Sequence, residues 1–318
     1  MKRIYLDNSA TTQVSKEVLD TMLPYFTEHY GNPSSLHTMG QEANVAVENA
    51  RAQVAKAIGA DAKEIIFTSC GTEADNLALV GVAQANKAKG NHIITSSVEH
   101  PAILRTCEFL QKEGFSVTYL PVDQYGMVSP ADVEAAITPQ TTLVSIMAVN
   151  NEIGTVQPIK EIGKIAKEHK VYFHTDAVQA IGKIPINVND QGIDMLSLAG
   201  HKIHAPKGVG ALYVRKGTKI QALIHGGGQE HNMKSGTENV PGIVGLGKAA
   251  EVAIRDFDKN TAIMRHLRDK LIKGILQLEA VRLNGHPTIR SPNNVNVSFN
   301  YIEGESIILF LDMAGIEG

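Results

Sequence analysis

The sequence is poor in cysteine and lacks tryptophan and long apolar runs. Only Cys70 and Cys107 carry thiols among 318 residues. Two thiols cannot build a disulfide framework, so we expect a reducing compartment, the cytoplasm. No apolar run approaches the roughly 20 residues of a membrane helix, and Asp7 interrupts the N-terminal stretch before the apolar core of a signal peptide could form. These absences argue against a secreted or membrane protein.

A strong charge of either sign is also missing. The chain has 30 lysines and arginines against 33 aspartates and glutamates, a formal net charge of −3. A polyanion-binding surface needs a basic excess, so we expect no direct nucleic-acid binding. The hydrophobic fraction is 43% and the charged fraction 20%, which is typical of a globular protein with one large core and a smaller module.

Short β-rich runs alternate with helical patterns through most of the chain. Most runs are apolar throughout, which is typical of strands covered on both faces. Between them, Pro101 opens and Gly114 ends one helical pattern, and residues 158–169 place isoleucines on one stripe. The alternation predicts an α/β fold with a mostly parallel sheet flanked by helices. The β-rich runs are residues 64–68, 92–96, 116–122, 142–149, 171–175, 194–199 and 210–214.

From about Val240 the pattern changes. Long helical stretches come first, and a strand in residues 293–299 and an amphipathic helix in residues 304–316 follow. One strand and two helices bury little apolar area by themselves. We therefore interpret this region as part of a second, smaller α+β unit.

Polar residues follow several of the predicted strands. Parallel strands bring their carboxyl ends to one edge of the sheet, where open α/β sheets bind ligands. The pair Gly71 and Thr72 opens a helix and suits a phosphate, although helix capping alone would also explain it. Lys202 and Lys207 follow the sixth run, and Lys202 lies closer to the strand end. The remaining polar residues at this edge are His100, Asn150, Asn151, Glu152, Asp176 and Gln179.

Together these residues match the needs of pyridoxal 5′-phosphate. A lysine such as Lys202 forms an imine with the aldehyde of this cofactor. A carboxylate such as Asp176 keeps the pyridine nitrogen protonated, because a negative charge favours the cationic form. Gln179 can hydrogen-bond the 3′-oxygen, and the flat imidazole of His100 can stack on the ring. Each residue alone has a simpler explanation as a cap or surface group, so the prediction depends on the set.

Motifs that occur together in one known family run in order along essentially the whole chain. They are YLDNSATT (5–12), YGNPSSLHTMG (30–40), FTSCGTEADN (67–76), VEHPAIL (98–104), NNEIGTVQPI (150–159), HTDAVQAIGK (174–183), GHKIHAPKGVGALYVRKG (200–217), HGGGQEHNMKSGTENVPGIVG (225–245) and NNVNVSF (293–299). With these motifs the chain resembles the cysteine desulfurases of the class V aminotransferase superfamily. The resemblance implies an aminotransferase-like fold that binds pyridoxal phosphate, with a large domain of seven mostly parallel strands over residues 13–255. Residues 1–12 and 256–318 would form a small α+β domain that is incomplete at its C-terminus.

The resemblance also implies a role for each matching residue. Lys202 would be the Schiff-base lysine, and His100 would stack on the ring and help to move protons. Asn8 would contact the substrate, and Asn151 would contact both substrate and cofactor. Thr237 would reach the cofactor phosphate of a neighbouring subunit, which implies a homodimer. The remaining residues implied to bind the cofactor are Gly71, Thr72 and His201 at the phosphate, Asp176 at the ring nitrogen and Gln179 at the 3′-oxygen.

The reaction implied is conversion of L-cysteine to L-alanine, with the sulfur carried as an enzyme persulfide to an iron–sulfur scaffold or another acceptor, such as one for tRNA thiolation. The thiolate is the reactive form of the accepting cysteine. The family's persulfide cysteine and the arginine that grips the substrate carboxylate follow the position of Gly318, so we expect a fragment of an active enzyme. Cys70 and Cys107 match neither position.

One further departure and three alternatives remain open. Ala199 stands where the family usually has a phosphate-binding serine, and Ser197 lies two residues earlier; losing one charge-assisted hydrogen bond, worth about 1.5–3 kcal/mol, would weaken cofactor retention. The alternatives are a selenocysteine lyase, another β-lyase that uses pyridoxal phosphate, and a non-catalytic iron–sulfur assembly scaffold. A metal site is not predicted, because the spacing of the candidate ligands is poor. Those candidates are His201, His204, His225 and His231.

Overall fold

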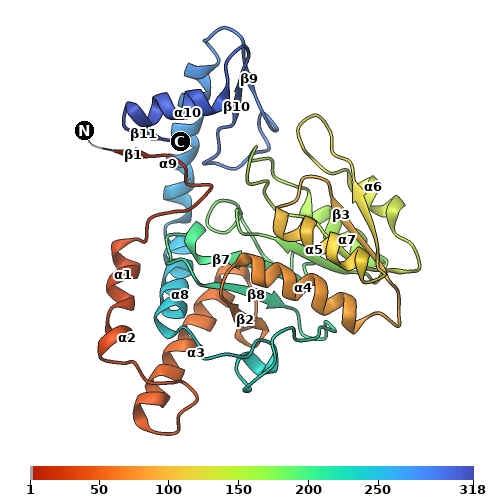
Figure 1. Cartoon of the computed structure of the whole chain (residues 1–318), viewed down its shortest axis with the longest axis vertical. Coiled ribbons are helices and arrows are strands. Elements are labelled where there is room, and N and C mark those ends of the chain that lie inside the picture. The colour runs from red at the N-terminus through yellow and green to blue at the C-terminus, as the bar shows by residue number, and fades with distance from the viewer. Residues whose placement is uncertain (1–2) are drawn as a thin grey trace.

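The computed structural model describes residues 3–318 and contains a central seven-stranded sheet (Figure 1). Its strand order is β2-β8-β7-β6-β5-β3-β4, and all neighbours are parallel except the two pairs that β8 makes. All seven predicted strands are present, and the α/β fold is confirmed. The strands are β2 (Ile65–Thr68), β3 (His92–Ser96), β4 (Ser116–Leu120), β5 (Thr141–Ser145), β6 (Tyr172–Asp176), β7 (Met195–Ala199) and β8 (Gly210–Val214).

Helices cover both faces of the sheet, which explains why the strands are apolar at successive positions. Neighbouring residues on one strand, such as Leu143 and Val144, enter two different buried clusters. One cluster joins the sheet to α4 (Gly71–Ala85) and α5 (Pro101–Lys112). The other joins it to helices of the opposite layer, in which α3 and α8 pack on each other. The helices of that layer are α1 (Lys16–Met22), α3 (Thr38–Ile58), α6 (Pro130–Ala136), α7 (Ile159–Glu168) and α8 (Val240–Arg255), and the short α2 (Pro24–Thr27) follows α1.

The helix predicted from Pro101 to Gly114 forms as expected. Pro101 occupies the first turn of α5, where its missing N–H costs nothing. The imidazole of His100 caps the helix by accepting from the Ala102 backbone N–H at 3.1 Å. Gly114 follows the last turn with φ +90°, a conformation that a side chain would disfavour.

A smaller unit lies at one end of the long helix α9 (Phe257–Ile275) (Figure 1). The strand predicted in residues 293–299 is β10 (Val297–Phe299), which pairs antiparallel with β9 (Val281–Leu283). α10 (Gly304–Met313) is the predicted amphipathic helix. The sequence pattern misses β9 and the parallel pair β1 (Ile4–Tyr5) and β11 (Ile316–Glu317), because runs of two or three residues show no periodicity. This pair joins the two ends of the described chain. Within residues 3–318, no helix is both long enough and apolar enough to span a membrane.

Two glycines in helices provide a matched test of packing. A methyl group at Gly163 in α7 would collide with the Gln191 carbonyl oxygen, whereas one at Gly274 in α9 would meet nothing within 4 Å. We expect Gly163→Ala to lower the free energy of unfolding by about 1–3 kcal/mol through overpacking. Gly274→Ala should raise it by about 0.5–1 kcal/mol, because alanine has less backbone entropy to lose. Urea denaturation measures both, and equal effects of the two variants would contradict the packing.

Candidate active site

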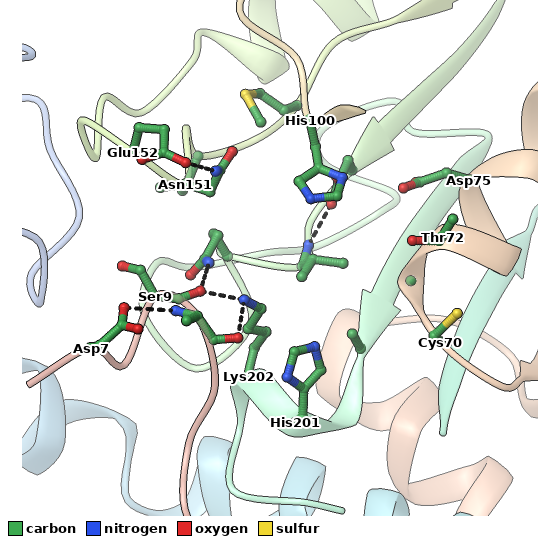
Figure 2. Close-up of a pocket in the computed structure, with 18 residues that line it drawn as sticks. Asp7, Ser9, Cys70, Thr72, Asp75, His100, Asn151, Glu152, His201 and Lys202 are labelled. Atoms are coloured by element: carbon green, nitrogen blue, oxygen red, sulfur yellow. Dashed lines mark hydrogen bonds between the residues drawn. The ribbon is translucent and has the colours of Figure 1, made fainter. Parts of the chain in front are cut away.

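A pocket of about 460 Å³ opens at the edge of the sheet where β6 and β7 end (Figure 2). Side chains enter it from five parts of the fold: the N-terminal segment, the start of α4, the start of α5, the turn after β5, and the ends of β6 and β7. Most of the predicted site residues are therefore brought together. The predicted residues that line the pocket are Gly71, Thr72, His100, Asn151, Asp176, Gln179, His201 and Lys202.

Lys202 ends a short 3₁₀ turn directly after β7, so the strand fixes where its amine lies. Its Nζ donates hydrogen bonds to the carbonyl oxygens of Ser9 and Ala10, the latter at 2.8 Å. Burial lowers the pKa of Lys202, which favours the neutral, nucleophilic amine. The charges of Asp7, Asp176 and Glu152 oppose this lowering. Lys207, by contrast, is exposed and does not line the pocket, as the sequence analysis expects.

Asp176 is the last residue of β6 and is buried beside the pocket. One carboxylate oxygen accepts from the Val178 N–H at 2.9 Å. Burial raises the pKa of Asp176, and that hydrogen bond and the charges of His100 and Lys202 lower it. A second buried carboxylate, Asp75 on α4, lines the same pocket, and its two oxygens have no hydrogen-bond partner within residues 3–318. A cation in the pocket would stabilise the charged form of both acids.

The N-terminus of α4 forms another wall. Gly71 and Thr72 occupy its first turn, and in the described chain no side chain caps it. Backbone N–H groups in a first turn have no intrahelical partner, and the helix dipole is positive there, so this end suits an anion. A methyl group at Gly71 would lie 2.8 Å from Val178 Cγ2, so only glycine leaves this wall open. Cys70 precedes the turn and also lines the pocket.

His100 faces the pocket from the start of α5 (Figure 2). Because its Nδ1 accepts from the Ala102 N–H, the neutral ring carries its proton on Nε2. The capping role and the site role are therefore compatible, since they use different ring atoms. His201 enters from the other side, and its Nδ1 lies 3.2 Å from the Thr11 hydroxyl. Burial lowers the pKa of His201, as do the charges of Lys202, Lys207 and Lys183.

The amide of Gln179 connects the pocket to the layer behind it. Its Nε2 donates to the Ser9 carbonyl at 2.8 Å, and its Oε1 accepts from Lys183 Nζ at 2.7 Å. Burial lowers the pKa of Lys183 to about 7. Asn151 lies across the pocket from Lys202 and donates to Glu152 at 2.7 Å. Hydrogen bonds thus orient the amides of both Gln179 and Asn151.

Two predicted site residues, Asn8 and Thr237, do not line the pocket. Asn8 does not line the pocket, although Asp7 and Ser9 on either side of it do. Ser197, two residues before Ala199, is fully buried, and its hydroxyl lies 3.0 Å from His174 Nε2. Thr237 lines a separate hollow of about 60 Å³, so its role toward a neighbouring subunit stays a prediction.

Sequence reasoning missed Asp7, Ser9 and Asp75 as pocket residues. Ser9 acts through its backbone oxygen, which no side-chain pattern could indicate. A signal for Asp75 did exist: it falls on the buried side of an apolar helix, four residues after Gly71. A carboxylate at such a position is rarely buried without a functional reason.

Glu99 supplies a pH-dependent test of this region. Its carboxyl group is buried, accepts from the Ser96 hydroxyl at 2.6 Å and from the Met147 N–H, and burial raises its pKa to about 8 from an ordinary value of 4.5. The folded protein therefore keeps a proton that the unfolded chain releases above pH 4.5. The stability from this group is full below pH 4.5 and is lost as the pH rises to 8.

We expect Glu99→Gln to remove this loss of stability. The slope of the free energy of unfolding against pH should change by on the order of 1 kcal/mol per pH unit between pH 4.5 and 8. Urea denaturation at several pH values measures it. Glu108→Gln, which changes an exposed carboxylate of α5, is the matched control and should leave the slope unchanged. A Glu99→Gln variant with the wild-type slope would contradict a protonated Glu99.

The donor set fits pyridoxal 5′-phosphate. The uncapped first turn of α4 offers N–H groups to a phosphate, and the open wall at Gly71 leaves it room. The buried carboxylate of Asp176 suits a pyridinium nitrogen, and a partly buried lysine lies in the same pocket. The four histidines considered as metal ligands do not assemble: within residues 3–318, no three His, Cys, Asp or Glu side chains are grouped so that they could hold a metal ion.

The chain is similar to known proteins over almost its whole length. The family model for aminotransferase class-V matches residues 4–317. A cysteine desulfurase IscS of Methanosarcina thermophila is 59% identical over 315 residues, which are 99% of this chain and 78% of that protein. One of Dictyoglomus turgidum is 56% identical over 319 residues, 100% of this chain and 81% of that protein.

Solved structures agree with these relatives. A NifS-like protein superimposes with a TM-score of 0.97 at 44% identity and covers 99% of this chain and 87% of that one. SspA in complex with cysteine superimposes with a TM-score of 0.85 at 40% identity and covers 98% and 86%. The family model, the sequence identities and the shared fold agree, and the chain belongs to the aminotransferase class-V family, among its cysteine desulfurases.

Proposed function

We propose that this chain removes sulfur from L-cysteine and leaves L-alanine, with pyridoxal 5′-phosphate held in the pocket by the residues described above. The observation that carries the proposal is Lys202, an amine with a lowered pKa fixed at the end of β7 opposite the uncapped start of α4. The family relation and the complex of the similar SspA with cysteine support the substrate. When bound, the cofactor supplies an aldehyde for the substrate amine and an electron sink for bonds at its Cα and Cβ.

The residues of the chain position that cofactor and move protons. Gly71, Thr72 and His201 would hold the phosphate, and Asp176 would keep a proton on the ring nitrogen. Gln179 would donate from Nε2 to the 3′-oxygen after release of the Ser9 carbonyl. His100 would stack on the ring and present its Nε2 proton to the pocket. The resemblance to the family implies these roles, and the presence of all six residues in one pocket supports them.

Lys202 would take the proton from the substrate Cα and return it to the carbon on the other side of the substrate nitrogen. Its lowered pKa favours this role, because a general base works best when its pKa lies near the working pH. Asn151 faces Lys202 across the pocket and would orient the substrate carboxylate, and Asn8 lies beside pocket residues of the N-terminal segment. The C–S bond breaks as a thiolate, such as that of the thiol reductant in the assay below, attacks the sulfur and becomes a persulfide. The bonding electron pair goes to the substrate Cβ, which takes up a proton to leave alanine.

Neither cysteine of the sequence is proposed as that thiolate. Burial raises the pKa of Cys107 to about 12, so its thiol stays protonated. Cys70 precedes the proposed phosphate-binding turn. The persulfide would pass to an iron–sulfur scaffold or another sulfur acceptor.

We also propose a cytoplasmic homodimer, with a large domain of residues 13–255 and a small domain of residues 1–12 and 256–318.

The test is product analysis after incubation of the purified protein with L-cysteine, a thiol reductant and pyridoxal phosphate. We expect equal amounts of L-alanine and sulfide. Pyruvate and ammonia as products would indicate a β-eliminating lyase instead. Release of alanine from L-selenocysteine but not from L-cysteine would indicate a selenocysteine lyase, and the absence of any product with bound cofactor would favour a scaffold.

A further inference from the structure

Residues 225–239 are the second part of the long connection between β8 and α8, and their path is unusual. Three successive residues that are not glycine, Glu230, His231 and Asn232, have φ values of +47°, +57° and +64°. Such a backbone is strained, and it persists only where the surrounding structure holds it. The same connection carries Thr237, seven residues later.

A buried ion pair holds this strained turn to the body of the large sheet. Arg51 of α3 donates to both carboxylate oxygens of Glu230, at 2.7 and 2.9 Å. The Phe67 N–H of β2 donates to the same carboxylate at 2.6 Å. The side chains of Arg51 and Glu230 are only 4% and 3% exposed. The fork geometry fixes the direction of the carboxylate as well as its position.

Arg51 is itself immobilised from other sides. Its Nη1 also donates to the Ile65 carbonyl at 2.9 Å, and its guanidinium lies 4.7 Å from the centre of the Phe67 ring. Its Nε donates at 3.0 Å to Glu48, a carboxylate of α3 that is half exposed. A buried ion pair is weak evidence for stability by itself, but it can select one conformation among several.

The turn and Thr237 are parts of one local structure. Glu230 and Thr237 line the same hollow beside β2. The Gly236 N–H, next to Thr237, donates to Gln229 Oε1 at 3.1 Å, and the Ser235 N–H donates to the Ile224 carbonyl. Displacement of Glu230 would therefore release the segment that carries Thr237.

We propose that the Arg51–Glu230 pair is a positioning device that holds the left-handed turn at residues 230–232 and so presents Thr237 to a second copy of the chain. This inference rests on the proposed function, in which Thr237 contacts the cofactor phosphate of the neighbouring subunit. Arg51 and Glu230 do not line the active-site pocket, and they act through Thr237.

The experiment uses the purified protein with bound pyridoxal phosphate and four variants: Glu230→Gln, Thr237→Ala, the double variant, and Glu48→Gln as the matched control. Glu48→Gln removes a partner of the same arginine that is not part of the turn. The first readout is tryptic cleavage after Lys234, the one lysine or arginine in residues 225–239. The second is the rate at which pyridoxal phosphate is released, and circular dichroism checks folding.

We expect Glu230→Gln to accelerate both cleavage and cofactor release about tenfold and Glu48→Gln to change neither. In the double variant, cofactor release should be no faster than in Thr237→Ala, because both changes remove the same contact. Unchanged cleavage in Glu230→Gln, or additive effects on release, would overturn the proposal. If Thr237→Ala alone leaves cofactor release unchanged, the proposed contact with the phosphate is wrong, and the presentation of Thr237 is wrong with it. Faster cleavage of Glu230→Gln would in that case still support the role of the Arg51–Glu230 pair in holding the turn. Arg51→Lys replaces Glu230→Gln if the latter does not fold.

Discussion

Lys202→Ala is expected to lower the rate of alanine formation by about a thousandfold or more. The amine is the one proposed both to join the cofactor and to move the Cα proton, and loss of a general base alone typically costs 10²–10⁴-fold. The side chain ends in the pocket with two backbone oxygens as partners, so its loss should leave the fold intact. Assay of alanine from L-cysteine at saturating pyridoxal phosphate measures the effect.

Lys207→Ala is the matched control, because this lysine lies five residues away on the same segment and is exposed. It should retain the wild-type rate. Reduction of the wild-type protein with borohydride, followed by peptide mass spectrometry, should find the pyridoxyl group on Lys202. A pyridoxyl group on Lys183 or Lys207, or a Lys202→Ala variant with ordinary activity, would contradict the site assignment.

Asp176→Asn should lower the same rate roughly a hundredfold, the size of effect seen when one preorganised electrostatic group is removed. The buried carboxylate would no longer favour a proton on the ring nitrogen, and the electron sink would weaken. The isosteric amide keeps an oxygen that can accept from the Val178 N–H, so the local turn should survive. Steady-state kinetics measure kcat and KM separately, and the effect should appear in kcat more than in KM.

Asp176→Glu provides the comparison, because it restores the charge with a longer side chain and should recover part of the activity. Circular dichroism and cofactor content distinguish a chemical effect from unfolding. An Asp176→Asn variant with an unchanged kcat would show that another group supports the ring nitrogen, and Asp75 is a second buried carboxylate in the pocket.

Much of the site follows from positions along the chain. Residues that directly follow parallel strands must meet at one edge, so Asp176 and Lys202 could be placed together before the structure was known. The pair Gly71 and Thr72 was ambiguous, because a capped helix and a phosphate site have the same sequence signature. The structure favours the phosphate site, since the turn has no side-chain cap in the described chain and opens into the pocket.

Other contacts of the site could be placed only with the three-dimensional fold. The backbone oxygen of Ser9 reaches Gln179 and Lys202 across separations of 170 and 193 residues, and carbonyl groups leave no trace in a sequence. The contact between Arg51 and Glu230 spans 179 residues. Neither could be predicted from periodicity, which reports only on neighbours in the same helix or strand.

The sequence by itself determined the seven strands, the helices between them, the order of the polar residues at the sheet edge and the family motifs, because all of these are local or follow from handed crossovers. Only the tertiary structure decided which side chains share one pocket, where Asp75 lies and how the connection carrying Thr237 is held. These depend on contacts between distant segments, and their energies arise from burial that exists only after the chain has folded.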